Sequence, residues 1–421
     1  MFDRPPTGEK AILVHVDFNE RADKKDSEEF YQLALSAGAD IVDSITTTRT
    51  IPDVKYFVGL GKAEEIKNLV SQAKIDLVLF NHSLSPSQER NLEKLLKCRV
   101  IDRTGLILDI FAQRAQSFEG KLQVELAQLN HLATRLVRGW THLERQRGGI
   151  GLRGPGETQL ESDRRLIRNR IKTIRSRLDK VQKSRAQNRR ARQRSLLPTV
   201  ALVGYTNVGK STLFNLLSGA HVYVANKPFA TLDPTMRQIA LPGAGPIILA
   251  DTVGFIRDLP HDLIEAFSAT LEETREASLL IHVIDSQDES REAHIVQVNE
   301  VLAQIGAQNI PRLLVYNKID LRPELKPDII KNAEGKPAIS HISVRENLGI
   351  DLLLQAIADL VYGDPVYRTI TLTQKEGKLR ALLYEMSAVL NEQVDDAGNL
   401  VLSIRMAKFD FERLFPNASL D

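Results

Sequence analysis

The chain has 421 residues, of which 43% are hydrophobic and 26% are charged, and its formal net charge is +2. This length and composition predict about two to four domains, each with enough apolar residues for a core. The single cysteine, Cys98, excludes an internal disulfide, and neither the apolar runs nor the opening MFDRPPTGEK resemble a membrane span or a signal peptide. We therefore expect a cytoplasmic protein, without membrane insertion, that acts as a monomer.

Residues 1–110 alternate between strand-like and helix-like patterns. Apolar runs predict strands at 11–18, 40–47, 56–58, 77–80 and 100–102, and helical spacing occurs at 27–37, 63–74 and 87–97. This alternation predicts a small α/β domain with a largely parallel sheet. The turn Gly59–Leu60–Gly61–Lys62 could hold a phosphate, but it lacks the rest of a phosphate-loop pattern, so a structural turn is the better interpretation.

Residues 111–196 change to a helical character. Two narrow apolar seams recur at helical spacing, one through Leu122, Leu126, Leu129, Ala133, Leu136 and Trp140, the other through Leu160, Ile167, Ile171, Ile174, Leu178 and Val181. Between them, the segment Arg147–Gly156 contains too many glycines for a helix. The pattern predicts an antiparallel helical hairpin with a long, flexible tip.

The basic charge of the chain is concentrated in this hairpin. Residues 138–194 contain 18 Lys and Arg against 5 Asp and Glu, a net charge of +13 that leaves the rest of the chain at −11. Such a segment is a candidate for binding a polyanion, and Arg145, Arg147 and Arg153 beside the tip glycines suit close contact with RNA. We favour RNA contact over a solvated loop, although some arginines between 164 and 194 will simply cover a solvated helix face.

The motif GYTNVGKS, from Gly204 to Ser211, predicts a loop that binds phosphates. It follows the apolar run Thr199–Val203 and precedes a helical pattern that Gly219 is expected to end. Glycines let backbone N–H groups turn towards an anion, and the helix N-terminus adds partial positive charge. Lys210 is expected to reach the β- and γ-phosphates, and the Ser211 hydroxyl to bind Mg²⁺.

A second motif, NKID, selects the base and follows the apolar run Arg312–Tyr316. The Asp320 carboxylate can accept two hydrogen bonds from guanine, whereas adenine would leave it unpaired. The Lys318 stem is expected to lie against the base, and Asn317 to contact both the base and the phosphate loop. A further guanine-contacting turn is expected at Ser343–Val344, where the usual second residue is alanine.

A third motif, DTVG from Asp251 to Gly254, follows the apolar run Pro246–Ala250. Asp251 would hold Mg²⁺ through water, and the Gly254 N–H would meet the γ-phosphate. In the preceding segment Phe229–Thr235, a threonine should close over Mg²⁺ while the γ-phosphate is present. We choose Thr231 for this role, with Thr235 as the alternative.

Phe255 occupies the position where many GTP hydrolases place a water-orienting glutamine. Either hydrolysis is slow or another group supplies this function. Asn207 offers one possibility, since GTPases with this asparagine can bind K⁺ beside the phosphates; the alternative is that Asn207 only bonds to neighbouring backbone. A partner surface that orders the loops is a further option.

The sequence thus predicts an α/β protein with four parts: an N-terminal α/β domain at 1–110, a basic hairpin at 111–196, a doubly wound, mostly parallel P-loop GTPase domain at 197–363, and a small α+β domain at 364–421. In the last part we expect strands at 367–373 and 400–406 around a helix at 378–391. The catalytic candidates are Asn207, Lys210, Thr231 and Gly254, and the Mg²⁺ candidates are Ser211, Thr231 and Asp251. The residues expected to contact GTP or GDP are Gly204, Tyr205, Thr206, Asn207, Val208, Gly209, Lys210, Ser211, Thr212, Phe229, Ala230, Thr231, Leu232, Asp233, Asp251, Thr252, Val253, Gly254, Asn317, Lys318, Ile319, Asp320, Ser343, Val344 and Arg345.

With these motifs in order, the chain resembles the HflX family of ribosome-associated GTPases over nearly its whole length. The most specific part of the resemblance is GGIGLRGPGETQLESDRR in the hairpin, followed by GYTNVGKST, FATLDPT, DTVGF and NKID. The resemblance implies binding to the large (50S) ribosomal subunit and its rRNA through the hairpin around Arg145–Glu157, with the tip 148–156 reaching towards the peptidyl-transferase centre. It also implies splitting or rescue of stalled ribosomes under stress. The resemblance also implies ATP hydrolysis through the N-terminal domain, but that domain contains no convincing ATP motif.

The main hypothesis is therefore that the protein is a GTP hydrolase whose GTP-bound state binds the large ribosomal subunit. The alternative is a switch that binds RNA or protein according to GTP or GDP, with negligible intrinsic hydrolysis because Phe255 replaces glutamine. A GTPase in RNA modification would need catalytic residues outside the nucleotide domain, and the sequence offers none.

Overall fold

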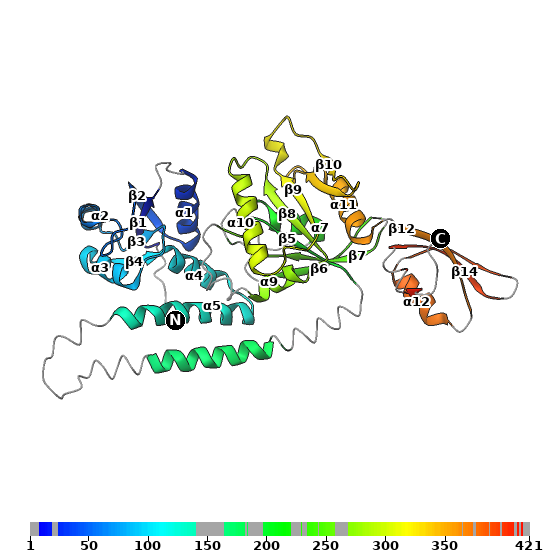
Figure 1. Cartoon of the computed structure of the whole chain (residues 1–421), viewed down its shortest axis with the longest axis horizontal. Coiled ribbons are helices and arrows are strands. Elements are labelled where there is room, and N and C mark those ends of the chain that lie inside the picture. The colour runs from blue at the N-terminus through cyan, green and yellow to red at the C-terminus, as the bar shows by residue number, and fades with distance from the viewer. Residues whose placement is uncertain are drawn as a thin grey trace. The chain divides into compact units, whose positions relative to one another are not determined.

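The computed structural model describes residues 8–18, 24–139, 164–181, 183, 197–219, 229, 234–242, 244–256, 268–363, 365–373, 376–386, 388–395, 398–407, 411 and 414–415. These residues form two compact units, which are described separately (Figure 1). The first unit holds the described residues up to 183, together with residues 229, 268 and 269, and the second unit holds the others. Within the described ranges, no helix is both long and apolar enough to cross a membrane.

The first unit is built on a fully parallel sheet in the order β2-β1-β3-β4. Its strands are β1 (Lys10–Asp17), β2 (Asp40–Thr48), β3 (Leu77–Phe80) and β4 (Arg99–Asp102). Helices α1 (Lys24–Ala37) and α4 (Arg103–Arg114) cover one face, and α2 (Leu60–Ala73) and α3 (Pro86–Leu96) cover the other (Figure 1). The expected parallel α/β fold is confirmed.

One predicted strand in this unit is wrong. Residues 54–56 form a turn that is closed by an isolated bridge between Asp53 and Phe57, and no strand follows at 58. The Asp53 carboxylate accepts hydrogen bonds from the Lys55 and Tyr56 N–H groups at 2.9 and 2.7 Å, which is a local alternative to strand pairing. Gly59 then begins α2 with φ of +83°, and a side chain there would overlap the Arg49 guanidinium. The glycine is therefore structural.

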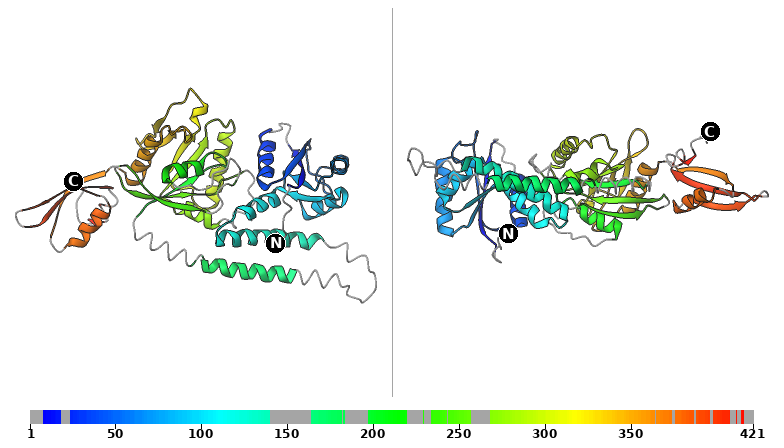
Figure 2. Two further views of the ribbon diagram at one scale, coloured as in Figure 1. Left: turned by 180° about the vertical axis from the view of Figure 1, so that it is seen from behind. Right: turned by 90° about the horizontal axis from the view of Figure 1, so that it is seen from below.

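Helix α5 (Phe118–Gly139) and the helix 164–181 lie side by side as two arms of a hairpin (Figures 1 and 2). Buried Leu122 packs with Ile174 and Leu178, and Arg170 donates two hydrogen bonds to Glu125, at 2.6 and 3.0 Å. The later residue on α5 thus meets the earlier residue on its partner, so the arms are antiparallel. Residues 140–163, including Arg145, Arg147 and Arg153, lie outside the described residues.

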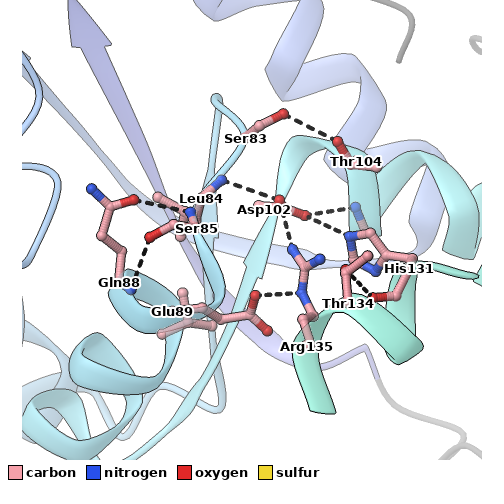
Figure 3. Close-up of polar contacts among 12 residues, drawn as sticks. Ser83, Leu84, Ser85, Gln88, Glu89, Asp102, Thr104, His131, Thr134 and Arg135 are labelled. Carbon is pink, nitrogen blue, oxygen red and sulfur yellow. Dashed lines mark hydrogen bonds and ion pairs between the residues drawn. The ribbon is translucent and has the colours of Figure 1, made fainter. Parts of the chain in front are cut away.

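A polar cluster ties α5 to the carboxyl end of the sheet (Figure 3). Arg135 reaches from α5 to Glu89 of α3 at 2.6 Å and to Asp102 at the end of β4 at 2.9 Å. The Asp102 carboxylate also accepts hydrogen bonds from the Leu84 and Gly105 N–H groups. Burial opposes ionisation of Asp102, but His131, Arg135 and Gly105 outweigh it and lower its pKa. This cluster fixes the C-terminal part of α5 to the sheet.

The second unit contains a seven-stranded, mostly parallel sheet in the order β10-β11-β9-β8-β5-β7-β6. Its inner strands are β5 (Thr199–Val203), β7 (Pro246–Asp251), β8 (Leu279–Asp285), β9 (Arg312–Asn317) and β11 (Pro337–His341), and its antiparallel edge strands are β6 (Thr235–Ala240) and β10 (Asp328–Lys331). The helices are α7 (Lys210–Ser218), α9 (Ser268–Arg275), α10 (Arg291–Gln304), the short η1 (Ile319–Leu321) and α11 (Ile350–Tyr362). The doubly wound fold expected of a P-loop GTPase is confirmed.

A smaller antiparallel sheet follows in the order β12-β14-β13. It consists of β12 (Pro365–Leu372), α12 (Gly377–Glu385), β13 (Val389–Val394) and β14 (Leu400–Ala407). The helix expected at 378–391 is therefore too long, because its last residues belong to β13. Between β13 and β14, the Asp395 N–H donates to the Asn399 carbonyl oxygen, and the Asp395 carboxylate accepts a hydrogen bond from the Asn399 N–H.

Candidate GTP-binding site

The predicted phosphate loop joins the end of β5 to the start of α7 and depends on two glycines. Gly204 has φ of +143°, and a Cβ there would lie 2.3 Å from the Val283 carbonyl oxygen. Gly209 has φ of +99°, and a Cβ there would lie 2.4 Å from the Asn317 amide nitrogen. Any side chain at these positions would push the loop away from β8 and β9. The loop therefore begins α7 with its backbone close to the sheet, at a helix end that attracts anions.

Lys210 is the buried cation of this loop, with a relative exposure of 6%. Its ammonium group donates hydrogen bonds to the carbonyl oxygens of Gly204, at 3.0 Å, and Tyr205, at 2.6 Å. Burial lowers the pKa of Lys210 to about 8, an effect that the Asp251 carboxylate partly opposes. A positive charge held in this way gains strongly from a phosphate placed at the loop.

Ser211 and Asp251 come together from α7 and the end of β7. The Ser211 hydroxyl donates a hydrogen bond to Asp251 at 2.8 Å, so the two oxygens lie where one small cation would contact both. Hydroxyl and carboxylate oxygens are ligands that Mg²⁺ prefers, so this donor set fits that ion. Next to them, the Thr252 hydroxyl donates to the Leu202 carbonyl oxygen at 2.5 Å and fixes the DTVG segment against β5.

Four candidates of the segment before β6 lie outside the described residues: Ala230, Thr231, Leu232 and Asp233. Phe229 is described and has a relative exposure of only 2%. Its ring packs edge-on against Phe111 of α4, with 4.5 Å between the ring centroids. Thr235, the alternative to Thr231, is the first residue of β6 and pairs with Asp251.

The NKID motif contacts the phosphate loop through its first two residues. The Asn317 amide donates to the Val208 carbonyl oxygen at 2.9 Å and accepts from the Val344 N–H at 3.1 Å. The Lys318 ammonium donates to the Asn207 carbonyl oxygen at 3.0 Å and pairs with Asp285 at 2.7 Å. The first two residues of the motif are thus fixed to the phosphate loop, two positions before Asp320.

Asp320 and Ser343 meet at the outer end of this motif, where the Ser343 hydroxyl donates to the Asp320 carboxylate. Since the Ser343 turn is closed by paired backbone hydrogen bonds with Leu348, the carboxylate has a fixed partner. Val344 contributes its backbone, so the departure from alanine leaves this contact in place. Arg345 differs from the others because its side chain is 79% exposed.

Gly254 and Phe255 complete the site beside Lys210. A Cβ at Gly254 would lie 3.0 Å from the Lys210 ammonium nitrogen and 2.9 Å from a Thr206 methyl carbon. Phe255 is buried and exchanges backbone hydrogen bonds with the loop, through Phe255 N–H to Gly204 and Thr206 N–H to Phe255. Its ring contributes no hydrogen bond where many GTP hydrolases place glutamine.

Two residues close to the site were missed from the sequence. Asp285 at the end of β8 pairs with Lys318, and His294 of α10 stacks on Tyr205. Asp285 could have been predicted from the sequence, because it ends an apolar run in a parallel sheet and the carboxyl ends of such strands meet at one edge. His294 had none, because the helix that carries it lies ninety residues after the loop in the chain.

A glycine-rich strand–helix loop with a buried lysine, a serine–aspartate pair and an NKID motif defines a P-loop GTPase. Three family profiles match the chain: "GTP-binding GTPase N-terminal" over residues 24–112, "GTP-binding GTPase Middle Region" over 114–192, and "50S ribosome-binding GTPase" over 199–318. Together they extend over both the first unit and most of the nucleotide-binding domain.

The GTPase HflX of Escherichia coli (strain K12) is 55% identical to the chain, over 98% of this chain and 97% of its own length. The GTPase HflX of Caldanaerobacter subterraneus subsp. tengcongensis is 45% identical to the chain, over 93% of this chain and 89% of its own length. A crystal structure of a GTP-binding protein from Sulfolobus solfataricus in complex with GDP is 26% identical, covers 84% of this chain and 98% of that chain, and has a TM-score of 0.45. The chain belongs to the HflX family of GTPases.

Proposed function

We propose that this GTPase binds the large (50S) ribosomal subunit in its GTP state and leaves it after hydrolysis, acting as a cytoplasmic monomer. Splitting or rescue of stalled ribosomes under stress is the outcome we propose for this cycle. The proposal is supported by the profile described as a 50S ribosome-binding GTPase and by the HflX relatives.

The observation that carries the proposal is the exposed basic face of the hairpin. The helix 164–181 buries Ile174 and Leu178 against α5 and turns most of its cationic side chains to solvent: Arg165, Arg168, Arg170, Lys172, Arg175, Arg177 and Lys180. Among these described cationic residues, only Arg170 pairs with a carboxylate, that of Glu125. Guanidinium groups on one solvated face suit phosphates of folded RNA, and they stand on the arms that lead to the glycine-rich tip.

We further propose that Ser211, Asp251 and Thr231 hold Mg²⁺ together with the phosphates of GTP. The ion would supply charge neutralisation between the β- and γ-phosphates. Lys210 would orient the same phosphates, the Gly254 N–H would meet the γ-phosphate, and Asp320 would select guanine. The twenty-five residues predicted from the motifs remain our proposed nucleotide contacts.

Asn207 is our proposed K⁺ ligand. It has φ of +62°, a conformation that asparagine tolerates better than most residues, and this accounts for its presence without any ion. The two explanations differ in one measurement. Faster hydrolysis in KCl than in NaCl, lost on Asn207→Ala, supports the ion site, whereas equal rates in the two salts exclude it.

Co-sedimentation with 50S subunits tests the main proposal. The intact chain is expected to pellet with subunits in a non-hydrolysable GTP analogue and to stay in the supernatant with GDP. Deletion of residues 148–156 should abolish pelleting, and replacement of the same residues by a glycine–serine segment of equal length controls for hairpin geometry. Binding should weaken steeply with salt, because it releases counterions from RNA. Pelleting that ignores the nucleotide, or that survives both tip variants, contradicts the proposal.

The alternative is a nucleotide-dependent switch with negligible intrinsic hydrolysis, and buried Phe255 is the observation that favours it. Turnover with and without 50S subunits separates the two. We expect slow turnover of the isolated chain and a large stimulation by subunits, since an ordered partner surface would supply what the Phe255 ring lacks. Turnover that subunits leave unchanged would favour the switch.

A further inference from the structure

Tyr205, the second residue of the phosphate loop, has a contact that no GTPase motif requires. Its ring is 7% exposed and lies flat on the imidazole of His294 from α10. The ring centroids are 3.9 Å apart and the planes differ by 14°. Two rings at this spacing form a close parallel stack, which fixes both side chains more firmly than apolar burial alone.

His294 is itself held in place by Asp288. The imidazole Nδ1 and the Asp288 carboxylate are joined by a hydrogen bond of 2.5 Å. The other carboxylate oxygen accepts a hydrogen bond from the Ser290 N–H at 2.9 Å, in the turn that leads into α10. The Asp288 N–H in turn donates to the Asp285 carbonyl oxygen. The imidazole is therefore positioned by a closed turn and does not depend on its own helix alone.

The same turn also reaches the phosphate loop by a second route. Asp285 pairs with the Lys318 ammonium at 2.7 Å, and Lys318 donates to the Asn207 carbonyl oxygen at 3.0 Å. Tyr205 and Asn207 are thus both held by residues that lie between the end of β8 and the first turn of α10. The first tie is made by stacked rings, and the second by an ion pair and a hydrogen bond.

The backbone of Tyr205 explains why its position matters for the reaction. Its carbonyl oxygen accepts a hydrogen bond from Lys210, and it forms a bridge with Phe255. Phe255 directly follows Gly254, whose N–H is our proposed γ-phosphate contact. A shift of Tyr205 would therefore displace both the lysine and the segment that senses the third phosphate.

We propose that His294, oriented by Asp288, is a positioning residue for GTP hydrolysis. It acts through Tyr205, which it holds so that Lys210 and Gly254 keep their places relative to each other. Loss of one stacked aromatic pair corresponds to about a 2- to 10-fold change in an equilibrium constant. Since GDP lacks the γ-phosphate that Gly254 would meet, but keeps the β-phosphate that Lys210 would reach, GDP affinity should change less than the hydrolysis rate.

Single-turnover hydrolysis of GTP by the full chain, alongside the affinity for a fluorescent GDP analogue, tests this assignment. His294→Ala is expected to slow hydrolysis by about 2- to 10-fold, with GDP affinity within about twofold of the original chain. His294→Phe keeps the stack but loses the bond to Asp288, so it should recover part of the rate. Asp288→Asn keeps the stack and weakens the same bond, so its rate should also lie between those of His294→Ala and the original chain. Val296→Ala, on an exposed side chain of the same helix, is the matched control and should change neither quantity.

A double-mutant cycle separates positioning from a general loss of structure. If His294 acts through Tyr205, the Tyr205→Ala/His294→Ala pair should hydrolyse GTP no more slowly than Tyr205→Ala. The proposal is overturned if His294→Ala hydrolyses GTP at the original rate, if His294→Phe is as slow as alanine, or if the two alanine effects simply multiply. Should His294→Ala fail to fold, His294→Phe and Asp288→Asn decide: slower hydrolysis by both supports the proposal, and the original rate for either overturns it.

Discussion

The two parallel sheets of this molecule both gather polar side chains at their carboxyl ends, but they use them differently. In the first unit, Asp102 follows β4 and bonds to Arg135, Leu84 and Gly105, so the polar groups satisfy one another (Figure 3). In the second unit, Asp251 and Asn317 end their strands beside a glycine-rich loop. Their neighbours there are backbone groups, the Ser211 hydroxyl and one buried lysine.

This difference teaches that buried polar residues at a sheet edge do not by themselves indicate a ligand site. The first edge holds an arginine between two carboxylates, which is a self-contained structural cluster. The second edge is distinguished by glycines whose missing side chains let the loop approach the sheet. Changes at the first edge should therefore affect stability, and changes at the second should affect nucleotide chemistry.

The largest effect is expected for Lys210→Ala. Removing a preorganised charge from the phosphates should slow GTP hydrolysis by about 10²- to 10³-fold. Since the charged form is already disfavoured by burial, the melting temperature should not fall. Steady-state hydrolysis and thermal unfolding measure the two quantities. If the variant folds and hydrolyses GTP at a near-normal rate, Lys210 is not needed for hydrolysis.

Arg135→Met should produce the opposite pattern. Asp102 is 3% exposed, so loss of its guanidinium partner should lower the free energy of unfolding of the first unit by about 2–3 kcal/mol. Affinity for GDP should stay unchanged. Arg170→Met removes an arginine of the same helical hairpin from a solvent-exposed pair and is the control, with no measurable change expected. Chemical denaturation measures the free energy of unfolding, and nucleotide titration measures the affinity for GDP. A weaker GDP affinity in Arg135→Met would contradict the comparison, because the first edge would then affect the nucleotide site.

A smaller effect is expected from pH at the second edge. Lys210 has a pKa of about 8 in the folded protein, below its ordinary value, so it begins to lose its proton above pH 8. Phosphates favour the charged form, so GTP affinity should fall by up to about tenfold per pH unit above that point, and binding should take up protons. The fold itself gains stability from this group between pH 8 and its ordinary pKa, because the unfolded chain then binds more protons. Calorimetry of GTP binding at pH 8.5, in buffers of different ionisation enthalpy, measures the proton uptake. Equal binding heats in all buffers would contradict it.

His282 provides the smallest test. Burial, then Arg312 and Lys210, lowers the pKa of this histidine of β8 to about 4. Its folded pKa lies below the ordinary value, so stability is lost as pH falls from about 6.5 towards 4, because the unfolded chain takes up a proton that the folded one resists. We expect a loss of about 1 kcal/mol between pH 7 and pH 5.5. His282→Leu should flatten this dependence in denaturation curves, and an unchanged slope would assign it to other groups.

Most of the second unit could be predicted from the sequence because its signals are local. Apolar runs ended by Gly204, Asp251 and Asn317 gave the strands and the loops that follow them, and each motif depends on residues within a few positions. The confirmed fold and GTPase assignment follow from this order. The same reasoning found the antiparallel hairpin, whose seams depend on helical spacing.

The errors and omissions have a different cause. The strand expected at 56–58 failed because the Asp53 side chain favours a turn, and the helix expected at 378–391 ran into β13 because pairing with β14 outweighs local helix preference. The Tyr205–His294 stack depends on how α10 packs after folding, which no local pattern records. Tertiary contacts between individual side chains could therefore not be predicted from the sequence.

The two bonds of the Lys318 ammonium have one more consequence. They hold the aliphatic stem in place, so the surface that we propose lies against a purine is preorganised and little side-chain freedom remains to be lost when the base arrives. Guanine nucleotides should accordingly bind with a smaller entropic penalty than a mobile lysine would impose. Asp285→Ala would release the stem, and van 't Hoff analysis of binding should then show the penalty return.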